Sequence, residues 1–402
     1  DLYPFEATVA SGASAEDIIE KIDIGGISLI RGAAKNFEDV VIIPSQADYA
    51  TLEGILRTRG AKTTLEERRH FARRAFAVSS HYDSAIFTYF DGEDHSELRL
   101  SAQSAKPLRY GENPHQQGIF YGELEKYFEQ LHGKELSYNN LQDVEAAVSL
   151  IQDFDEPTFA ILKHNNACGC ASRSTILEGW EAALAGDPVS AFGGVLVANR
   201  PIDLQTAEEI NKLFFEVLIA PDFTAESLPV LESKKNRILL RQLQPVSAQW
   251  SYRSMLGGIL AQETDRSVET IQDMKPVTKV VPTAQELEDL VFATKLVKHS
   301  KSNAIVLSKA GQLIASGVGQ TSRVDALKQA IEKARHFGFE LKGAVLASDA
   351  FFPFDDCVTL AAEAGITAIA QPGGSVRDED SIKAADAHGI AMVMTGVRHF
   401  KH

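Results

Sequence analysis

Short apolar runs alternate with amphipathic stretches along most of the chain, and the period of each stretch predicts an element. Residues 14–22 begin with Ser14 as a plausible N-cap and carry two acidic residues in the first turn, which predicts a helix. Residues 52–78 contain many charges and no proline, and they predict a long helix. Residues 39–43 predict a short strand. The polar stretch 91–104 predicts a linker and a domain boundary.

Beyond this linker the two periods alternate. Strands are predicted at residues 159–163, 193–198, 304–307, 344–347 and 367–370. Helices are predicted at residues 144–154, 174–185 and 204–214, and residues 276–299 begin a second helix–strand series. Strands that alternate with helices indicate α/β layers with a largely parallel or mixed sheet.

The second series contains a partial repeat of the first. Lys163-His164 with Asn166 resembles Lys298-His299 with Asn303, 135 positions further along. Each group lies beside a short apolar strand. The repeat is consistent with a duplicated unit, although a dipeptide match also arises by chance.

Composition limits the class of protein. A chain of 402 residues is expected to form two or three domains, and 44% hydrophobic with 24% charged residues is typical of a soluble globular protein. There is no apolar run of membrane-spanning length. The net charge of −15 argues against general nucleic-acid binding, because an acidic chain repels phosphate backbones. Three cysteines and a start without a recognisable secretory signal favour a reducing cytoplasm.

The sequence LRYGENPHQ, which begins at Leu108, is dense in polar side chains. Gly111 and Pro114 restrict its backbone, and loops of this kind commonly hold binding residues. Arg109 is suited to a phosphate or a carboxylate. A surface turn with solvated charges would have the same composition, so both interpretations stay open for the loop alone.

The sequence ILKHNNACGCA carries the strongest local signal for catalysis. An apolar strand ends at Lys163-His164, and catalytic groups collect at the C-terminal ends of strands in open α/β sheets. Lysine offers a cation for a developing oxyanion, and histidine titrates near neutrality. The alternative is a hydrogen-bonded histidine and a solvated lysine at an ordinary strand end. Cys168 and Cys170 lack a second ligand pair and are interpreted as packing residues.

Further segments combine glycine or aromatic residues with charge. Gly193 follows an aromatic residue and suits close approach of a ligand, and SGVGQTSR places Arg323 after two glycines without a complete dinucleotide fingerprint. DAFFPFDD joins phenylalanines to carboxylates, which suits a flat heteroaromatic ring with N–H donors. The basic ending RHFKH can close over an anion or fray. Tight turns, packing and solvated charges would give the same patterns.

Taken together, these segments resemble a known family. The chain contains, in the family's order, LRYGENPHQ, LKHNNACG, DPVSAFGG, VKHSKSNAI, GVGQTSRV, SDAFFPFDD, QPGGS and TGVRHFKH. The family is that of the bifunctional AICAR transformylase/IMP cyclohydrolases, and the resemblance extends from about Leu98 to His402. The N-terminal segments DLYPFEATVA, KIDIGG and RGAAKNF resemble the later part of its cyclohydrolase domain.

The resemblance implies roles for single residues. Lys163 and His164 match the family's catalytic pair, in which the histidine assists proton removal from the substrate amine and the lysine supports that transfer. Asn303 matches an asparagine that helps to polarise the formyl oxygen. The other matched positions are implied to contact the nucleotide or the folate: Arg109, Tyr110, Asn140, Gly193, Arg323, Phe351, Pro353, Asp356, Arg398 and His402.

The resemblance also implies a reaction and an architecture. The reaction transfers the formyl group of the cosubstrate 10-formyltetrahydrofolate to the 5-amino group of AICAR, in de novo purine biosynthesis. The architecture is α/β, with two cytidine-deaminase-like α/β/α units at residues 98–275 and 276–402. They follow a C-terminal remnant of a methylglyoxal-synthase-like cyclohydrolase domain at residues 1–97. A cytoplasmic homodimer with shared active sites is implied, without nucleic-acid or membrane partners. The zinc signature of the deaminases is missing, so no catalytic metal is expected.

Two other classes of function stay open on the sequence. One is a non-catalytic nucleotide-binding module, and the other is a deaminase-like hydrolase. Release of tetrahydrofolate in a steady-state assay would distinguish transfer from binding alone. Bound zinc would favour the hydrolase.

We also expect little or no cyclohydrolase activity. The family's cyclohydrolase domain begins well before the position that matches Asp1. Tyr3, Asp23 and Lys35 match residues of that second site and are expected to lack partners there. Incubation of the chain with formyl-AICAR should therefore yield no IMP above background. Turnover to IMP at a normal rate would contradict this expectation.

Overall fold

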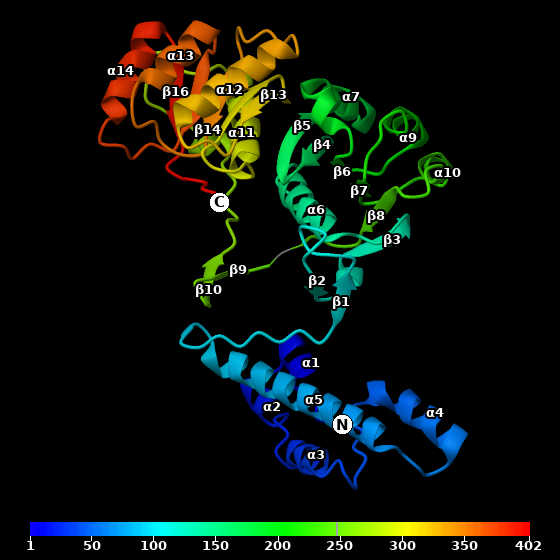
Figure 1. Ribbon diagram of the computed structural model, residues 1–402. Helices are drawn as coiled ribbons and strands as arrows, with labels where there is room; N and C mark the ends of the chain where they lie inside the picture. Colours follow the sequence, from blue (N-terminus) through cyan, green and yellow to red (C-terminus); the bar gives the residue numbers. More distant parts are fainter. Residues whose placement is uncertain (247) are drawn as a thin grey trace. The chain divides into compact units, whose positions relative to one another are not determined.

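The computed structural model describes residues 1–246 and 248–402, which form two compact units (Figure 1). Unit 1 comprises residues 1–107 and 120–122, and unit 2 comprises residues 108–119 and 123–402. Strands β1 (Ala105–Leu108) and β2 (Gly118–Tyr121) form a two-stranded sheet where the chain passes from one unit to the other. The domain boundaries expected at residues 97 and 275 stay predictions.

Unit 1 is built mainly from helices. They are α1 (Phe5–Ala10), α2 (Ala15–Ile19), α3 (Gly25–Lys35), α4 (Tyr49–Arg59), α5 (Leu65–Asp91) and the 3-10 turn η1 (Gln46–Asp48). The helix predicted after Ser14 is present, because the Ser14 hydroxyl accepts a hydrogen bond from the Asp17 N–H at 3.1 Å. Two apolar clusters form the core, one around Ala75 and the other around Phe5.

Two expectations for unit 1 are wrong. The single helix predicted over residues 52–78 is divided in two, because Gly60 ends α4 with a φ of 66° and Thr64 begins α5 with a capping box. Residues 39–43 form no strand. Among the described residues of unit 1, only β1 and β2 are extended strands, and they pair with each other. A strand without a neighbour would leave its backbone groups unpaired.

Unit 2 contains a mixed sheet of 12 strands. In their order across the sheet they are β11 (Lys275–Pro276), β16 (Ala391–Met394), β15 (Ala368–Gln371), β14 (Val345–Ser348), β12 (Ile305–Lys309), β13 (Gln312–Gly317), β5 (Asn166–Ser172), β4 (Thr158–Lys163), β6 (Val195–Ala198), β7 (Val217–Ala220), β8 (Ile238–Gln242) and β3 (Phe128–His132). The strands predicted from apolar runs, β4, β6, β12, β14 and β15, are all confirmed. A separate hairpin consists of β9 (Trp250–Met255) and β10 (Gly258–Glu263).

Helices cover both faces of this sheet (Figure 1). They are α6 (Tyr138–Ile151), α7 (Ile176–Gly186), α8 (Pro188–Ala191), α9 (Leu204–Ile210), α10 (Ser227–Leu231), α11 (Ala284–Lys298), α12 (Arg323–His336), α13 (Asp356–Ala364) and α14 (Asp378–His388), with 3-10 turns η2 (Leu124–Lys126) and η3 (Ile271–Asp273). Because side chains alternate along a strand, Leu162 of β4 packs with α6 and α11, whereas Ile161 packs with α7 and α9. Unit 2 is therefore an α/β structure whose core lies on both faces of a mixed sheet.

The sheet contains one arrangement twice. We call the half from β3 to β8 the first repeat and the half from β11 to β16 the second repeat. The order β5-β4-β6-β7-β8-β3 of the first repeat recurs as β13-β12-β14-β15-β16-β11 in the second. The pairing directions also recur, with antiparallel β4–β5 and β12–β13 hairpins followed by parallel strands. Strands β5 and β13 pair with each other, at Ala171 and Gln312, and join the repeats.

The duplication is present, but the Lys-His echo does not mark it. Lys163 is the last residue of β4, whereas Lys298 is the last residue of α11. The residue that corresponds to Lys163 is Lys309, the last residue of β12. The similar dipeptides therefore lie at different places in the two repeats, and our interpretation of the echo was wrong.

A buried ion pair connects the repeats. The Nζ of Lys298 lies 2.9 Å, and the Nε2 of His299 2.7 Å, from the Oδ2 of Asp153 after α6. Burial raises the pKa of Asp153, but hydrogen bonds and charge from His299 and Lys298 outweigh burial and hold the pKa below 3.8. Burial lowers the pKa of His299, although the hydrogen bond and charge of Asp153 oppose this effect. The Lys298 ammonium balances the charge of Asp153.

Replacement of Asp153 by alanine should destabilise unit 2 strongly. The change leaves the buried Lys298 ammonium without its carboxylate, which costs about 3–5 kcal/mol for a buried pair. Urea denaturation measures this loss, with the exposed neighbour substituted in Asp155→Ala as a matched control. The carboxylate is ionised above pH 3.8, so the difference should persist down to that pH and shrink as pH falls through the lowered pKa. Equal stability of the two variants would contradict the assignment.

Candidate functional site

The Lys163-His164 pair lies at the end of a strand, as predicted, and this strand end leads into the turn of a β-hairpin. Lys163 of β4 is paired with Asn166 of β5, so His164 and Asn165 form a two-residue turn. Their φ angles are 51° and 65°, and positive values at both positions are typical of the type I′ turn that suits a twisted hairpin. The His164 side chain is exposed at the tip.

Neighbouring elements hold this turn in place. The carboxylate of Asp143 on α6 accepts a hydrogen bond from the Asn165 N–H at 2.6 Å. Burial raises the pKa of Asp143, although the hydrogen bond from Asn165 opposes this effect. The Nζ of Lys163 donates to the carbonyl oxygen of Phe192 at 2.8 Å. The turn is thus fixed by a helix on one side and by the segment before β6 on the other.

The second repeat has the same turn without the histidine. Ala310 and Gly311 have φ angles of 52° and 63°, and the carboxylate of Asp289 accepts hydrogen bonds from their N–H groups at 2.9 and 2.7 Å. The Nζ of Lys309 donates to the carbonyl oxygen of Lys342 at 2.7 Å. The aspartate and lysine contacts therefore belong to the fold. The imidazole of His164 is what the first repeat adds.

Gly193 and Asn140 have structural roles in addition to their predicted contacts with the nucleotide. Gly193 directly follows Phe192 with a φ of 73°, and Gly343 directly follows Lys342 with a φ of 77°, so both repeats require this conformation. Asn140 is buried, and its Oδ1 accepts a hydrogen bond from the Ser137 hydroxyl at 2.9 Å in the capping box of α6. Ligand contacts by Gly193 and Asn140 stay predictions.

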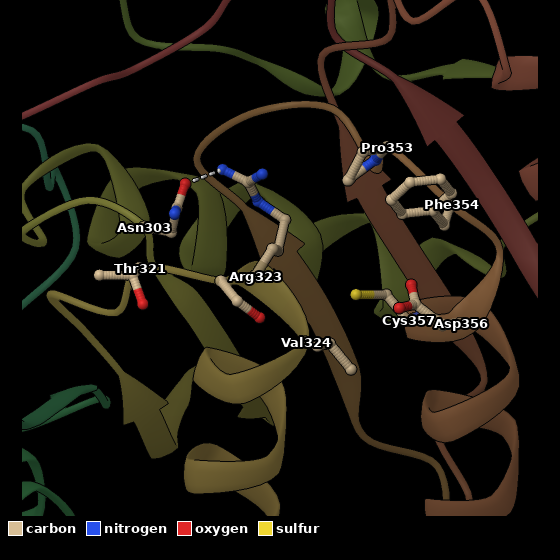
Figure 2. A pocket seen from close by; sticks show the side chains of 9 residues that line it. Asn303, Thr321, Arg323, Val324, Pro353, Phe354, Asp356 and Cys357 are labelled. Carbon is tan, nitrogen blue, oxygen red and sulfur yellow. Dashed lines mark hydrogen bonds between the residues drawn. The ribbon is translucent and has the colours of Figure 1, made fainter.

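A pocket of about 340 Å³ lies beside the start of α12 (Figure 2). Its lining residues are Asn303, Thr321, Ser322, Arg323, Val324, Pro353, Phe354, Asp356 and Cys357. The volume is in the range of small-molecule sites. Asn303, Arg323, Pro353 and Asp356 were named from the sequence. The structure places them together from three separate segments of the second repeat, at residues 303, 321–324 and 353–357.

Sequence reasoning missed several residues of this wall. Thr321, Ser322 and Phe354 lie inside the motifs GVGQTSRV and SDAFFPFDD, and Cys357 directly follows the second motif, but nothing in those motifs shows which side chains face a cavity. The aromatic side chain in the lining is that of Phe354, whereas the predicted Phe351 contributes its carbonyl oxygen as an acceptor for Arg323 at 3.2 Å.

The guanidinium of Arg323 organises the pocket. Its Nη2 lies 2.8 Å from the Oδ1 of Asp349 and also donates to the Oδ1 of Asn303 at 2.8 Å, as the dashed line in Figure 2 shows. The side chains of Arg323 and Asp349 are only 8% and 0% exposed. The charge of Arg323 is thus already balanced by a buried carboxylate, and the same guanidinium fixes the orientation of the Asn303 amide.

Asn166 connects the hairpin turn to this pocket. Its Nδ2 donates to the carbonyl oxygen of His164 at 2.9 Å, and its Oδ1 accepts a hydrogen bond from the Lys301 N–H at 3.0 Å. Lys301 precedes Asn303 by two residues, which corresponds to at most about 7 Å of chain. The Lys163-His164 turn and Asn303 therefore lie in one region, although they come from different repeats.

The C-terminal segment lies at the same place. The Lys401 N–H donates to the Ser302 hydroxyl at 3.1 Å, and the Ser302 N–H donates to the Lys401 carbonyl oxygen at 2.9 Å. The Arg398 guanidinium lies 4.4 Å from the ring centroid of Phe400, and the ring of His402 lies 5.4 Å from it. Arg398 and His402 therefore belong to a segment that is paired with the residue before Asn303.

Arg109 and Tyr110 are placed next to α6. The exposed Arg109 guanidinium lies 5.6 Å from the ring centroid of Tyr110. The Asn139 side chain at the start of α6 donates to the Glu112 carbonyl oxygen at 3.2 Å, which holds the loop against this helix. Because α6 also carries Asp143, the loop and the His164 turn rest on one element. A contact of Arg109 and Tyr110 with the nucleotide stays a prediction.

The residues predicted for the second site lie in unit 1. Asp23 is buried, and its Oδ1 accepts a hydrogen bond from the Gly26 N–H at 2.6 Å, at the start of α3. Lys35 is exposed in the last turn of α3, and Tyr3 is exposed with its ring centroid 5.9 Å from the Nζ of Lys21. Asp23 thus stabilises a helix end, and cyclohydrolase roles for all three stay predictions.

The described residues contain neither a metal site nor a membrane-spanning helix. Within residues 1–246 and 248–402, no group of three or more His, Cys, Asp or Glu side chains is arranged to hold a metal ion. No helix in the same residues combines the length and apolar character needed to cross a membrane.

Cys168 and Cys170 are buried, and burial raises the pKa of Cys168 to about 12 and raises that of Cys170 as well. Both belong to β5, where Cys168 lies in the apolar cluster with α7 and Cys170 in the apolar cluster with α6.

Comparisons with known proteins identify the family. The family model described as AICARFT/IMPCHase bienzyme matches residues 33–333. A bifunctional purine biosynthesis protein PurH of Bacteroides thetaiotaomicron is 63% identical over 402 residues, which is 100% of this chain and 79% of that protein. Proteins of the same name from Acetivibrio thermocellus and Rhodospirillum rubrum are 49% and 48% identical, and each match covers 100% of this chain and 80% of the relative.

One solved structure also matches a small part of the chain. A diaminohydroxyphosphoribosylaminopyrimidine deaminase/5-amino-6-(5-phosphoribosylamino)uracil reductase of Thermotoga maritima is 26% identical over 24% of this chain and 30% of that one. Its TM-score of 0.21 is too low to support a conclusion. The match of the family model to most of the chain, and identities of 48% and more over its whole length, are sufficient without it. The chain belongs to the AICARFT/IMPCHase bienzyme family.

Proposed function

We propose that this chain transfers the formyl group of 10-formyltetrahydrofolate to the 5-amino group of AICAR, with Lys163, His164 and Asn303 at the reacting atoms. Family membership supports the reaction. The observation that carries the residue assignment is the bridge through Asn166, which joins the His164 turn to the segment that leads into the Asn303 pocket.

The chemistry moves an acyl group between two nitrogens. The amine of AICAR is a poor nucleophile, because its lone pair is delocalised into the imidazole ring. Its attack on the formyl carbon forms a tetrahedral oxyanion, after which the bond to the folate nitrogen breaks and the amine loses a proton. The rate must therefore come from alignment of the two substrates and from electrostatic support of the oxyanion.

Each of the three residues fits one of these needs. The exposed imidazole of His164 accepts the amine proton, and the Lys163 cation supports that transfer. The Asn303 amide carries two N–H donors, and one of them is used by the Gln320 carbonyl oxygen at 2.9 Å. The other N–H remains for the formyl oxygen. The contact with Arg323 keeps the Oδ1 of Asn303 away from that oxygen.

The three arginines divide between two tasks. Arg323 is neutralised by Asp349 and acts on the pocket through Asn303, so it is less suited to a phosphate than the sequence indicated. Arg109 and Arg398 each lie against an aromatic ring, and no carboxylate partner is found for either among the described residues. We therefore assign the phosphate of AICAR to Arg109 and Arg398. The pocket wall of Phe354, Pro353 and Asp356 is then left for the folate and the carboxamide.

Two finer assignments follow the family. The two repeats are proposed to be cytidine-deaminase-like α/β/α units, within residues 98–275 and 276–402, and the repeated strand order supports this. The functional form is proposed to be a cytoplasmic homodimer with shared sites, and this assignment rests on the family resemblance alone. Sedimentation of the purified chain tests the assembly.

Substitution of His164 by alanine should remove most turnover. The backbone should tolerate the change, because Ala310 has nearly the same φ in the second repeat. Loss of the base should lower kcat by a factor of ~10²–10⁴, while AICAR still binds. Steady-state release of tetrahydrofolate measures kcat, and titration calorimetry measures binding. An unchanged kcat would exclude His164 as the base.

Lys163 and Lys309 form a matched pair for a second test. Each side chain donates one hydrogen bond to a backbone carbonyl at the same place in its repeat, so Lys163→Ala and Lys309→Ala lose the same structural contact. Only Lys163→Ala should lose formyl transfer, because only its ammonium lies beside His164. The formyl-transfer assay and a thermal denaturation of both variants separate the effects. Equal losses of activity would show that the Lys163 contact is structural.

A further inference from the structure

A buried histidine holds the C-terminal segment. The Nδ1 of His399 lies 2.6 Å from the Oδ2 of Asp265, and its Nε2 lies 3.0 and 3.1 Å from the two carboxylate oxygens of Glu269. The side chains of His399 and Glu269 are 2% and 4% exposed. Only a protonated imidazole donates from both nitrogens, so His399 is an imidazolium between two carboxylates. We call these three residues the histidine clamp.

The clamp fixes a segment that borders the candidate site. The backbone N–H of His399 donates to the backbone carbonyl oxygen of Asp349 at 3.0 Å. The backbone of Lys401 forms two hydrogen bonds with Ser302. Asp349 is the partner of Arg323, and Ser302 directly precedes Asn303. The segment from Arg398 to His402 thus touches, through its backbone, the residue that pairs with Arg323 and the residue that directly precedes Asn303.

The other side chains of the segment do not explain its position. The side chain of Phe400 contacts those of Arg398 and His402, within the same segment. In the described part of the chain, the side-chain hydrogen bonds from residues 398–402 to another element are all made by His399. Its two partners lie between β10 and η3, in a part of unit 2 that the formyl-transfer mechanism does not use.

We infer that the histidine clamp of His399, Asp265 and Glu269 positions Asn303 and Arg398 for the reaction, and that His399 acts as a positioning residue. This inference rests on the proposed function. The clamp works through the backbone of residues 399–401 and touches no substrate. When it opens, the C-terminal segment loses its side-chain anchor, Ser302 loses a fixed neighbour, and both the amide and the arginine are displaced.

The clamp also makes the site sensitive to alkali. Burial lowers the pKa of His399, but hydrogen bonds and charge from Asp265 and Glu269 outweigh it and raise the pKa to about 9. Lys298 adds a positive charge that acts on Asp265, and Arg398 and Lys401 lie on the same segment as His399. Since the pKa of His399 is raised from 6.5, its stabilisation is complete below that value and is lost as pH rises through about 9.

Three variants test the inference in the formyl-transfer assay. His399→Leu removes the clamp, and kcat/KM for AICAR should fall by about 10- to 100-fold at neutral pH, as a small misplacement of reacting groups does. Glu269→Gln lets a neutral imidazole keep both contacts, donating to Asp265 and accepting from the amide. This variant should keep the activity of the wild type while losing its decline near pH 9. His388→Leu, at an exposed position on α14, is the matched control and should change neither quantity.

Hydrogen–deuterium exchange of residues 299–303 and 398–402 provides a readout that does not depend on turnover. Lower protection of these amides, relative to their intrinsic exchange rates at the same pH, supports the clamp when it is found in His399→Leu and in the wild type above pH 9. If the wild type transfers formyl and His399→Leu has the same kcat/KM, pH profile and exchange, the clamp inference is wrong and the proposed function stands. If Glu269→Gln keeps the alkaline decline, the decline belongs to another group, such as Lys401, and the inference is also wrong. If the wild type transfers no formyl, the proposed function fails, and the exchange experiment still decides whether the clamp fixes the segment.

Discussion

The pairing of β5 with β13 is the contact on which the candidate site depends. It joins two repeats, each with its own hairpin and helices, into one sheet of 12 strands. The pairing is antiparallel, so the start of β5 lies toward the end of β13, and the His164 turn comes close to the segment before β12. The hydrogen bond between Asn166 and Lys301 is formed at this junction. The proposed base, His164, and the proposed amide, Asn303, therefore come from different repeats, and neither repeat contains both.

Duplication separates structural contacts from chemistry within a single chain. The lysine at the hairpin end, the aspartate that holds the turn and the glycine with positive φ all occur in both repeats, as Lys163 and Lys309, Asp143 and Asp289, and Gly193 and Gly343. A feature that both repeats retain is explained by the fold. The imidazole of His164 has no counterpart at Ala310, so the fold does not require it. This asymmetry is a physical reason, independent of any relative, to locate proton transfer at the first turn.

The sequence predicted five strands of the sheet from short apolar runs such as residues 159–163 and 344–347, but not the equally apolar β7 and β16, because a short apolar run alone does not distinguish a buried strand from a buried helix. It did not predict β5, whose small residues NACGCAS are suited to strand packing but are not typical of strands. The break at Gly60 was also missed, because a single glycine does not end every helix. In the site, the motifs located Asn303, Arg323, Pro353 and Asp356, but not the buried Asp349 that neutralises Arg323. Such a partner is set by tertiary contacts between distant segments, which local patterns do not contain.

Two buried ion pairs border the segment that leads into Asn303, one between Arg323 and Asp349 and the other between His399 and its carboxylates. Removing such charges from water is costly, and apolar side chains of similar size would often be as stable or more stable. Apolar contacts, however, have no direction, and they would leave the Oδ1 of Asn303 without its donor. A guanidinium that donates to both Asp349 and Asn303 defines one orientation, and an imidazolium with two acceptors defines one position for the C-terminal backbone. The cost of burying these charges is therefore explained by the geometry that they impose on a reaction whose rate depends on alignment.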